Sequence, residues 1–231
     1  MKKISFLALV LFVISCGKEQ ADLTVKGHIK GLKKGTVYLK KSNDSTLITL
    51  DSLVINGVSD FELHSEIDTP EVFFLYLDKN SSEDHRISFF ADKGITEINT
   101  TLKNFVVDAK IKGSKQQEVL DDYQLMMSKF NGKNLDLIKE NFDAQRDNDT
   151  AKMNAIEKEY NGLIKRKYLY TVNFAINNKD SEVAPYLALS EIYDANVTLL
   201  DTIHNSLTPT VKASKYGKEL ESFIKKIKKN E

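Results

Sequence analysis

Two stretches decide the fold, Leu23-Thr-Val-Lys-Gly-His-Ile29 and Thr36-Val-Tyr-Leu-Lys40, because apolar and polar residues alternate along both. A period of two places neighbouring side chains on opposite faces of a β-strand. The turn-forming residues Gly31-Leu-Lys-Lys-Gly35 lie between them. Similar short runs follow at 46–54, 60–67, 71–78, 86–91, 95–102 and 105–111. We therefore predict an antiparallel β-sandwich or open barrel over residues 23–113.

The hydrophobic period changes near Gly113-Ser114. Ser114 is a suitable N-cap, and apolar residues then recur at helical spacing as far as Asn131-Gly132, where we expect this helix to end. Met153, Ile156, Tyr160, Leu163 and Tyr170 follow a seven-residue rhythm, and two further helical patterns lie nearer the C-terminus. The sequence thus predicts an all-α region over residues 114–231 and an α+β chain overall.

The first sixteen residues have the features of an export signal. Lys2 and Lys3 precede an apolar run that ends at Ile14, and this run would be about 16 Å long as a helix, against ~30 Å for a bilayer core. That length fits a signal peptide and not a membrane span. The following Ser15-Cys16 resembles a bacterial lipobox, in which acyl chains such as palmitate are attached to the cysteine. We expect a signal peptide at 1–15 and a lipidated tether at 16–22; a secretory signal beside an incidental cysteine is the alternative.

The composition excludes several classes of function. Lysine plus arginine and aspartate plus glutamate both number 33, so no net charge attracts nucleic acid. A single cysteine cannot form an internal disulfide, a Cys-x-x-Cys redox centre or a thiolate zinc site. No nucleophile elbow, dinucleotide-binding motif or phosphate loop is present. We therefore expect no catalytic residue, no cofactor, no metal and no nucleic-acid partner.

Two groups of polar residues are candidate sites. Glu62, His64 and Glu66 alternate along one predicted strand and would share a face, where they would suit a metal, although a solvated antiparallel strand has the same pattern. The remaining histidines are isolated in sequence and give no defined Ser-His-Asp arrangement; these are His28, His85 and His204.

Aromatic and basic residues also have two interpretations. The helical half is rich in aromatic side chains that would line a ligand groove or, as we favour, fill a helical core; these are Tyr160, Tyr168, Tyr170, Phe174, Tyr186 and Tyr193. Four lysines near the C-terminus would attract anionic lipid or, as we favour, form a solvated helix end; these are Lys225, Lys226, Lys228 and Lys229.

Several short motifs resemble a known arrangement. The motifs in the first half are Val25-Lys-Gly-His-Ile-Lys-Gly-Leu32, Thr36-Val-Tyr-Leu39, Leu50-Asp-Ser-Leu-Val-Ile-Asn-Gly57 and Phe90-Ala-Asp-Lys-Gly94. Residues 25–113 thereby resemble the uncharacterised β-rich domain at the N-terminus of many lipoproteins of Bacteroidetes-type bacteria. Lys112-Gly-Ser-Lys115, Asn178-Lys-Asp-Ser-Glu-Val-Ala184 and Ser214-Lys-Tyr-Gly-Lys-Glu-Leu220 resemble the helical connector of the same proteins.

The resemblance also shows which domain of the family this sequence is expected not to have. In that family the connector usually leads to a thioredoxin-like domain with a Cys-x-x-Cys centre, and this sequence has no cysteine pair. We therefore expect the chain to be without that domain, and none of the family's catalytic residues is assigned to a position here.

The sequence favours an exported, membrane-anchored lipoprotein that acts as a non-catalytic binding or scaffolding module. We expect it in the cell envelope, attached to the inner or outer membrane and facing the periplasm or the cell surface. Its partners would be that membrane and a protein of the envelope. The alternative functions are an accessory to a separate periplasmic thioredoxin-like oxidoreductase, and a hydrolase whose site is assembled only by the fold.

The anchor gives the first testable prediction. Substitution of Cys16→Ala removes the only sulfur that can carry a thioether-linked lipid, so incorporation of labelled palmitate should fall to background. Membrane attachment should be lost, or the signal peptide should remain attached. Labelling is measured on the immunoprecipitated protein, and acylation that persists in the variant would contradict the assignment.

Overall fold

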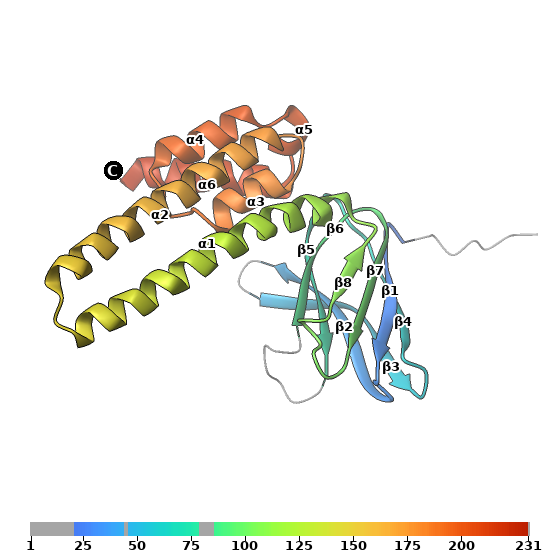
Figure 1. Cartoon of the computed structure of the whole chain (residues 1–231). Coiled ribbons are helices and arrows are strands. Elements are labelled where there is room, and N and C mark those ends of the chain that lie inside the picture. Colours follow the sequence, from blue (N-terminus) through green and yellow to red (C-terminus); the bar gives the residue numbers. More distant parts are fainter. Residues whose placement is uncertain (1–20, 44–45, 79–85, 231) are drawn as a thin grey trace, which may run out of the picture.

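The computed structural model describes residues 21–43, 46–78 and 86–230. The strands are β1 (Leu23–Lys30), β2 (Lys34–Asn43), β3 (Thr46–Asn56), β4 (Asp60–Ser65), β5 (Glu71–Leu77), β6 (Arg86–Ala91), β7 (Gly94–Thr101) and β8 (Lys110–Lys112). The helices are α1 (Lys115–Arg146), α2 (Thr150–Asn177), α3 (Val183–Ser190), α4 (Val197–Ser206), α5 (Pro209–Lys212) and α6 (Lys215–Asn230). All strands precede the helices (Figure 1), which confirms the predicted α+β class.

The strands form a sandwich of two four-stranded sheets, with orders β4-β1-β7-β8 and β3-β2-β5-β6. Along β5, buried side chains alternate with half-buried ones, as the period of two in the sequence predicts. The buried faces of both sheets contribute to one apolar core that includes Leu23, Val37, Phe61, Phe73 and Ile98. Burial of this shared core holds the sheets together.

One strand pair departs from the antiparallel pattern. Five of the six pairings between described strands are antiparallel, whereas β1 runs parallel to β7. Gly27 lies opposite Ile98 in this parallel pair. A Cβ atom on Gly27 would lie 1.7 Å from the carbonyl oxygen of Ile98, so only glycine permits this close approach of the two backbones.

The strand predicted over 105–111 is wrong for most of its length. Residues 103–108 form turns, and only Lys110–Lys112 pairs with β7. Phe105 is buried in the β core from this turn, and its carbonyl oxygen accepts a hydrogen bond from the Thr100 hydroxyl at 2.6 Å. Phe105, one of the apolar residues that suggested a strand, therefore anchors a turn.

The first helix begins where the sequence predicts and ends much later. The Ser114 side chain accepts a hydrogen bond from the backbone N–H of Gln117 at 3.1 Å and caps α1. The predicted end at Asn131-Gly132 is wrong, because α1 continues to Arg146. An interior glycine costs a helix only about 1 kcal/mol. Packing of the later turns of α1 against α2 offsets that cost.

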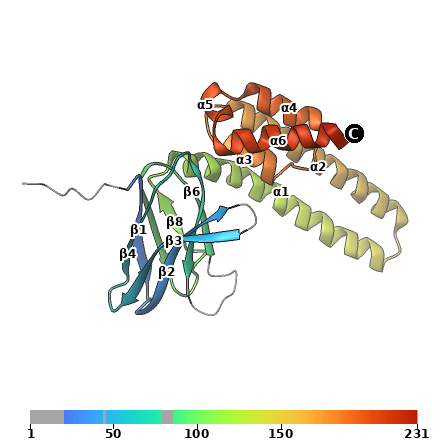
Figure 2. The ribbon, with the colours of Figure 1, turned by 180° about the vertical axis from the view of Figure 1, so that it is seen from behind.

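The helical region packs on the sandwich at β5 and β6 (Figures 1 and 2). Phe90 of β6 is fully buried there, with ring centroids 5.5 Å from Tyr186 of α3 and 5.8 Å from Tyr216 of α6. Val72 of β5 pairs with Phe90 and packs against the same cluster. Residues from both regions thus share one apolar cluster at the junction.

Hydrogen bonds to the strand backbone fix the orientation of this junction. The Tyr216 hydroxyl accepts from the backbone N–H of Val72 at 3.1 Å, and the Gln117 side chain accepts from the backbone N–H of Phe90 at 2.7 Å. Both donors are on strands, and both acceptors are on helices. Because an unpaired buried N–H is costly, rotation of the helices away from this position is disfavoured.

A buried ion-pair cluster adds a third connection. The Glu71 carboxylate on β5 is only 5% exposed. Lys41 on β2 donates to it at 2.9 Å, and Lys215 at the start of α6 donates to its other oxygen. Loss of one partner from such a cluster leaves an uncompensated charge, so the cluster resists separation of the two regions.

Some predictions fall on residues that are not described. The expected signal peptide 1–15, Cys16, most of the tether 16–22 and His85 lie outside the described residues. Within the described ranges, no helix has the length and apolar character needed to cross a bilayer.

Glycine-to-alanine substitution should have opposite effects on the free energy of unfolding at Gly27, where β1 and β7 approach closely, and at Gly132 in α1. Gly27→Ala should lower the free energy of unfolding by about 3 kcal/mol or more, because the new methyl group overlaps the Ile98 carbonyl. Gly132→Ala, inside α1 with nothing within 4 Å of the added carbon, should raise it by about 0.5–1 kcal/mol. Urea titration of both variants measures the difference, and equal effects would contradict the strand geometry.

Glu182 gives a pH-dependent prediction. Burial, followed by repulsion from Asp92, raises the pKa of this carboxyl, which accepts a hydrogen bond from Ser214 at the start of α6. The folded state therefore binds the proton more tightly than the unfolded state, and stability falls as pH rises above about 4.5 through the raised pKa. Glu182→Gln keeps an acceptor for Ser214 without the buried charge. Its melting temperature should exceed that of the wild type at pH 7, with the difference shrinking toward pH 4.5; a constant difference would contradict this explanation.

Candidate functional site

Helices α1 and α2 form an antiparallel hairpin whose tip projects away from the rest of the molecule (Figures 1 and 2). Local contacts set the reversal of the chain. Asn148 has a φ of 54°, in the left-handed region that asparagine tolerates. The Asp149 side chain then accepts from the backbone N–H of Lys152 at 2.9 Å and caps α2. The two helices consequently face each other over most of their length.

The side chains between the two helices follow a heptad pattern, with spacings of three and four residues. On α1 these positions are Tyr123, Met127, Phe130, Asn134, Leu137, Asn141 and Ala144. On α2 they include Met153, Ile156, Tyr160, Leu163 and Tyr170. Only four buried residues form the core of the tip half, namely Leu137, Ala144, Ile156 and Leu163. The hairpin tip therefore has a thin core.

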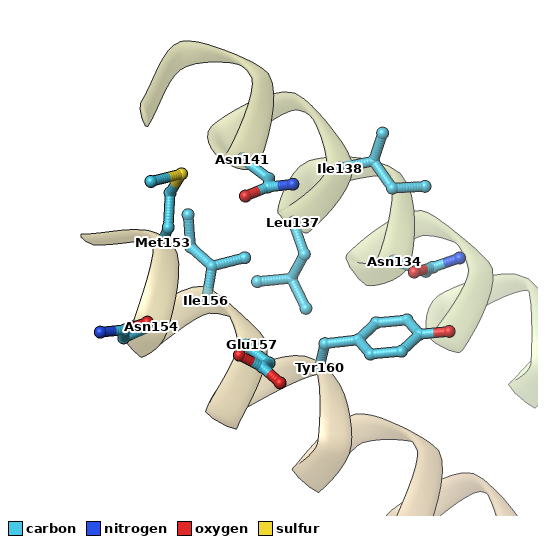
Figure 3. A pocket seen from close by; sticks show the side chains of 9 residues that line it. All are labelled: Asn134, Leu137, Ile138, Asn141, Met153, Asn154, Ile156, Glu157 and Tyr160. Carbon is cyan, nitrogen blue, oxygen red and sulfur yellow. The ribbon is translucent and has the colours of Figure 1, made fainter. Parts of the chain in front are cut away.

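A hollow of about 490 Å³ opens between the helices in this tip half (Figure 3). Its lining includes the apolar side chains of Leu137, Met153 and Ile156 and the amides of Asn134, Asn141 and Asn154. Figure 3 shows Leu137 and Ile156 directed toward each other between the helices. An apolar lining with a few amides suits binding by burial and directional hydrogen bonds.

Asn134 contributes an unsatisfied acceptor to this hollow. Its Oδ1 atom is buried and has no hydrogen-bond partner, and no other side-chain atom in the described ranges shares that state. Burial of an acceptor without a hydrogen-bond donor costs about 1–3 kcal/mol of stability. The next amide of α1 in the hollow, Asn141, lies one heptad further along the helix. The seam thus includes polar groups where an isolated helical pair is expected to have apolar ones.

An exposed apolar stripe borders the hollow. Leu135, Ile138 and Phe142 have spacings of three and four residues and so lie on one face of α1. Their exposed fractions are 66%, 43% and 67%. Tyr160 of α2, which lines the hollow, is 42% exposed. Hollow and stripe together form what we call the hairpin surface, a partly uncovered apolar area on an elongated arm.

The predicted histidine–carboxylate group is only partly assembled. Glu62 and His64 lie on the outward face of β4, with 3.3 Å between a carboxylate oxygen and Nε2. Glu66 follows the end of that strand at Ser65. Among the described residues no group of three His, Cys, Asp or Glu side chains could hold a metal ion.

A second, shallow hollow of about 610 Å³ lies on the same sheet face. His28 Nδ1 lies 2.7 Å from Asp60, and Asn99 and Glu97 are nearby on β7. A His–Asp pair of this kind orients the base in hydrolytic triads. The described residues that line this hollow include no serine, threonine or cysteine, so this lining offers the pair no hydroxyl or thiol to activate.

The aromatic residues of the helical half divide into two groups. Tyr170, Phe174 and Tyr186 pack in the cluster at the base of the hairpin, as the core interpretation predicts. Tyr168 donates to Asp194 at 2.7 Å, which raises the pKa of its hydroxyl to about 12. Tyr160, in contrast, belongs to the hairpin surface, and Tyr193 is 58% exposed. The groove interpretation therefore applies to Tyr160, outside the main aromatic cluster.

Two of the C-terminal lysines form ion pairs within the protein. Lys225 pairs with Glu221 at 2.6 Å and Lys228 with Asp201 at 2.6 Å. These pairs agree with the solvated helix end that the sequence favours. His204 lies in the last turn of α4, where burial lowers the pKa of its imidazole. Neither feature contributes to the hairpin surface.

The sequence patterns did not indicate the hairpin surface on α1. Asn134, Leu137, Ile138 and Asn141 all follow Asn131-Gly132, where the helix was expected to end. The signal for them was the continuation of the heptad spacing beyond the glycine. It was weak because two of the seam positions are asparagine.

Comparison with known protein families identifies a domain in the first half of the chain. A search of curated proteins found no match. Residues 23–120, which include the eight described strands and the first turns of α1, match the family described as Domain of unknown function (DUF4369). A domain of this uncharacterised family is therefore present at residues 23–120.

Proposed function

We propose that this chain is an exported, lipid-anchored module that binds a partner without catalysis, and that the hairpin surface is its binding site. The hairpin surface is the observation that carries the proposal. It combines a hollow, an apolar stripe and an unpaired acceptor, and it belongs to an arm that the sandwich does not cover. Conversely, the second hollow, with its His28–Asp60 pair, has no serine, threonine or cysteine among its described lining residues.

The position of the arm supports this role. Strand β1 enters the sandwich on the side facing away from the hairpin tip (Figures 1 and 2). An anchor at Cys16 would precede β1 by only a few residues. Helix α1 has 32 residues, which corresponds to about 48 Å. With the membrane at the N-terminal side, the arm would carry the hairpin surface well away from the lipid.

The rigid junction also supports a scaffolding role. The aromatic cluster around Phe90 and the buried Glu71 ion pairs hold the base of the arm against the sandwich. An arm held at a fixed angle loses less conformational entropy on binding than a freely hinged one. The proposed module therefore presents its binding surface in a defined direction.

Site-specific photo-crosslinking in intact cells tests this function. A photoreactive amino acid replaces Ile138 in the hairpin surface or, as a control, Leu125, which is 67% exposed on the first half of α1. Light should give a discrete covalent adduct from position 138 and none from position 125. Absence of any adduct at position 138, in cells where the protein is membrane-bound, would refute the hairpin as the binding site.

A further inference from the structure

The outward face of the sheet β3-β2-β5-β6 carries three aromatic rings that lie outside the cluster at the helical junction. Tyr38 of β2 and Tyr76 of β5 are partners in the strand register, and Phe74 lies two residues before Tyr76, on the same face. All three side chains are half-buried. The next pair on this face is Val72 with Phe90, which belongs to the junction. The rings therefore extend the apolar surface of the junction along the sheet.

Two cations lie over these rings. The Nζ atom of Lys40 is 4.7 Å from the ring centroid of Tyr76 and 5.2 Å from that of Tyr38. The guanidinium carbon of Arg86, on β6, is 5.2 Å from the ring centroid of Phe74. Within the described ranges neither cation forms an ion pair, so each positive charge faces aromatic rings in place of a carboxylate.

No acidic side chain of the described strands is available on this face. The four strands include two carboxylates, Asp51 and Glu71. Glu71 is buried in its ion-pair cluster, and Asp51 accepts from the backbone N–H of His64 on β4 at 2.8 Å. The outward register positions instead add hydroxyl groups, at Thr36, Thr49, Ser52 and Ser88. The face thus combines aromatic rings, positive charge and hydroxyl groups.

We propose that this face binds an acidic saccharide, a sugar polymer whose residues carry carboxylate or phosphate groups. We call it the aromatic–cationic face and define it by Tyr38, Lys40, Phe74, Tyr76 and Arg86. The C–H bonds on the flat side of a sugar ring pack on an aromatic ring, and the acidic group accepts hydrogen bonds from the two cations. The neighbouring hydroxyl side chains can bond to sugar hydroxyls. The site is separate from the hairpin surface and goes beyond the function proposed above.

The two cations have donors to offer such a ligand. An ammonium group has three N–H donors and a guanidinium group has five, and contact with the face of a ring supplies no lone pair to accept them. In the described ranges neither Lys40 nor Arg86 donates a hydrogen bond to the protein or forms an ion pair. An acidic group placed beside the rings would therefore gain charge-assisted hydrogen bonds without breaking any within the sheet.

The form of the face favours a saccharide over other anionic ligands. Insertion into a lipid surface needs apolar side chains that stand out from the protein, whereas these three rings are half-buried. Single-stranded nucleic acid is bound along a positively charged groove that follows its backbone, and the face defined here has two cations. A simple inorganic anion would make no use of the rings.

Calorimetric titration of the full chain in detergent tests the ligand class. Oligomers of galacturonic acid supply carboxylates and phosphomannan supplies phosphates, while neutral galactan oligomers, inorganic phosphate and oligothymidylate are the comparisons. At least one acidic saccharide should bind at least about tenfold more tightly than every comparison ligand. Equal or tighter binding of any comparison ligand overturns the proposal, and so does the absence of binding by both acidic saccharides.

Substitutions then test whether this face is the site. Lys40→Gln and Arg86→Gln each remove one charge, and Tyr76→Leu removes a ring while keeping an apolar side chain. Each should weaken binding of the acidic saccharide at least about fivefold. Lys26→Gln is the matched control, because Lys26 is an exposed strand lysine on the other sheet, where the register places acidic residues beside it. The control should leave the affinity unchanged, and an equal loss in all four variants contradicts the assignment.

Labelling of lysine amines locates the contact in the unsubstituted protein. A bound acidic saccharide should slow the acetylation of Lys40 and leave that of Lys26 unchanged, as measured by mass spectrometry of the digested chain. Equal protection of the two lysines, or none at Lys40, would place the ligand elsewhere. Neither measurement involves the hairpin, so failure of the saccharide site leaves the photo-crosslinking result at Ile138 unaffected, and the reverse also holds.

Discussion

Burial of Phe90 beneath the helices is the constraint on which the architecture depends. A fully buried aromatic side chain on the outer face of a sheet requires a cover, and α3 and α6 supply it through Tyr186 and Tyr216. The hydrogen bond from the Phe90 backbone to Gln117 holds α1 in the same place. Because these contacts set the direction in which α1 leaves the sandwich, they also determine where the hairpin tip lies.

The hairpin shows how stability is distributed along one helix. The base of α1 is held by the aromatic cluster that includes Tyr123, whereas the tip half relies on a small seam around Leu137 and Ile156. Few buried apolar contacts mean low local stability. A surface with a thin core and uncovered apolar side chains gains the most from a partner, since association then adds the contacts that a single chain does not have.

The β domain has a different character. Its core is continuous, and its outward face includes paired polar side chains: His28 pairs with Asp60 on the neighbouring strand, and Glu62 pairs with His64 on the same strand. That pattern is expected of a solvated sheet and requires no ligand. The domain of unknown function at residues 23–120 thus supplies a rigid base. The feature that carries the proposed binding lies mainly beyond it, in the later turns of α1 and in α2.

The sequence alone determined the α+β class, the strand faces and the Ser114 cap, because these depend on periodicity and on contacts between near neighbours. Only the tertiary structure decided that α1 continues through Gly132, that 105–111 is mostly a turn, and that β1 runs parallel to β7. Each of these outcomes depends on contacts between residues distant in sequence: α2 stabilises a helix across a glycine, the core takes up Phe105, and the Ile98 carbonyl fits against Gly27. The hairpin surface is apparent only once α1 is known to continue to Arg146. In the sequence, the asparagines at two seam positions interrupt the apolar heptad pattern.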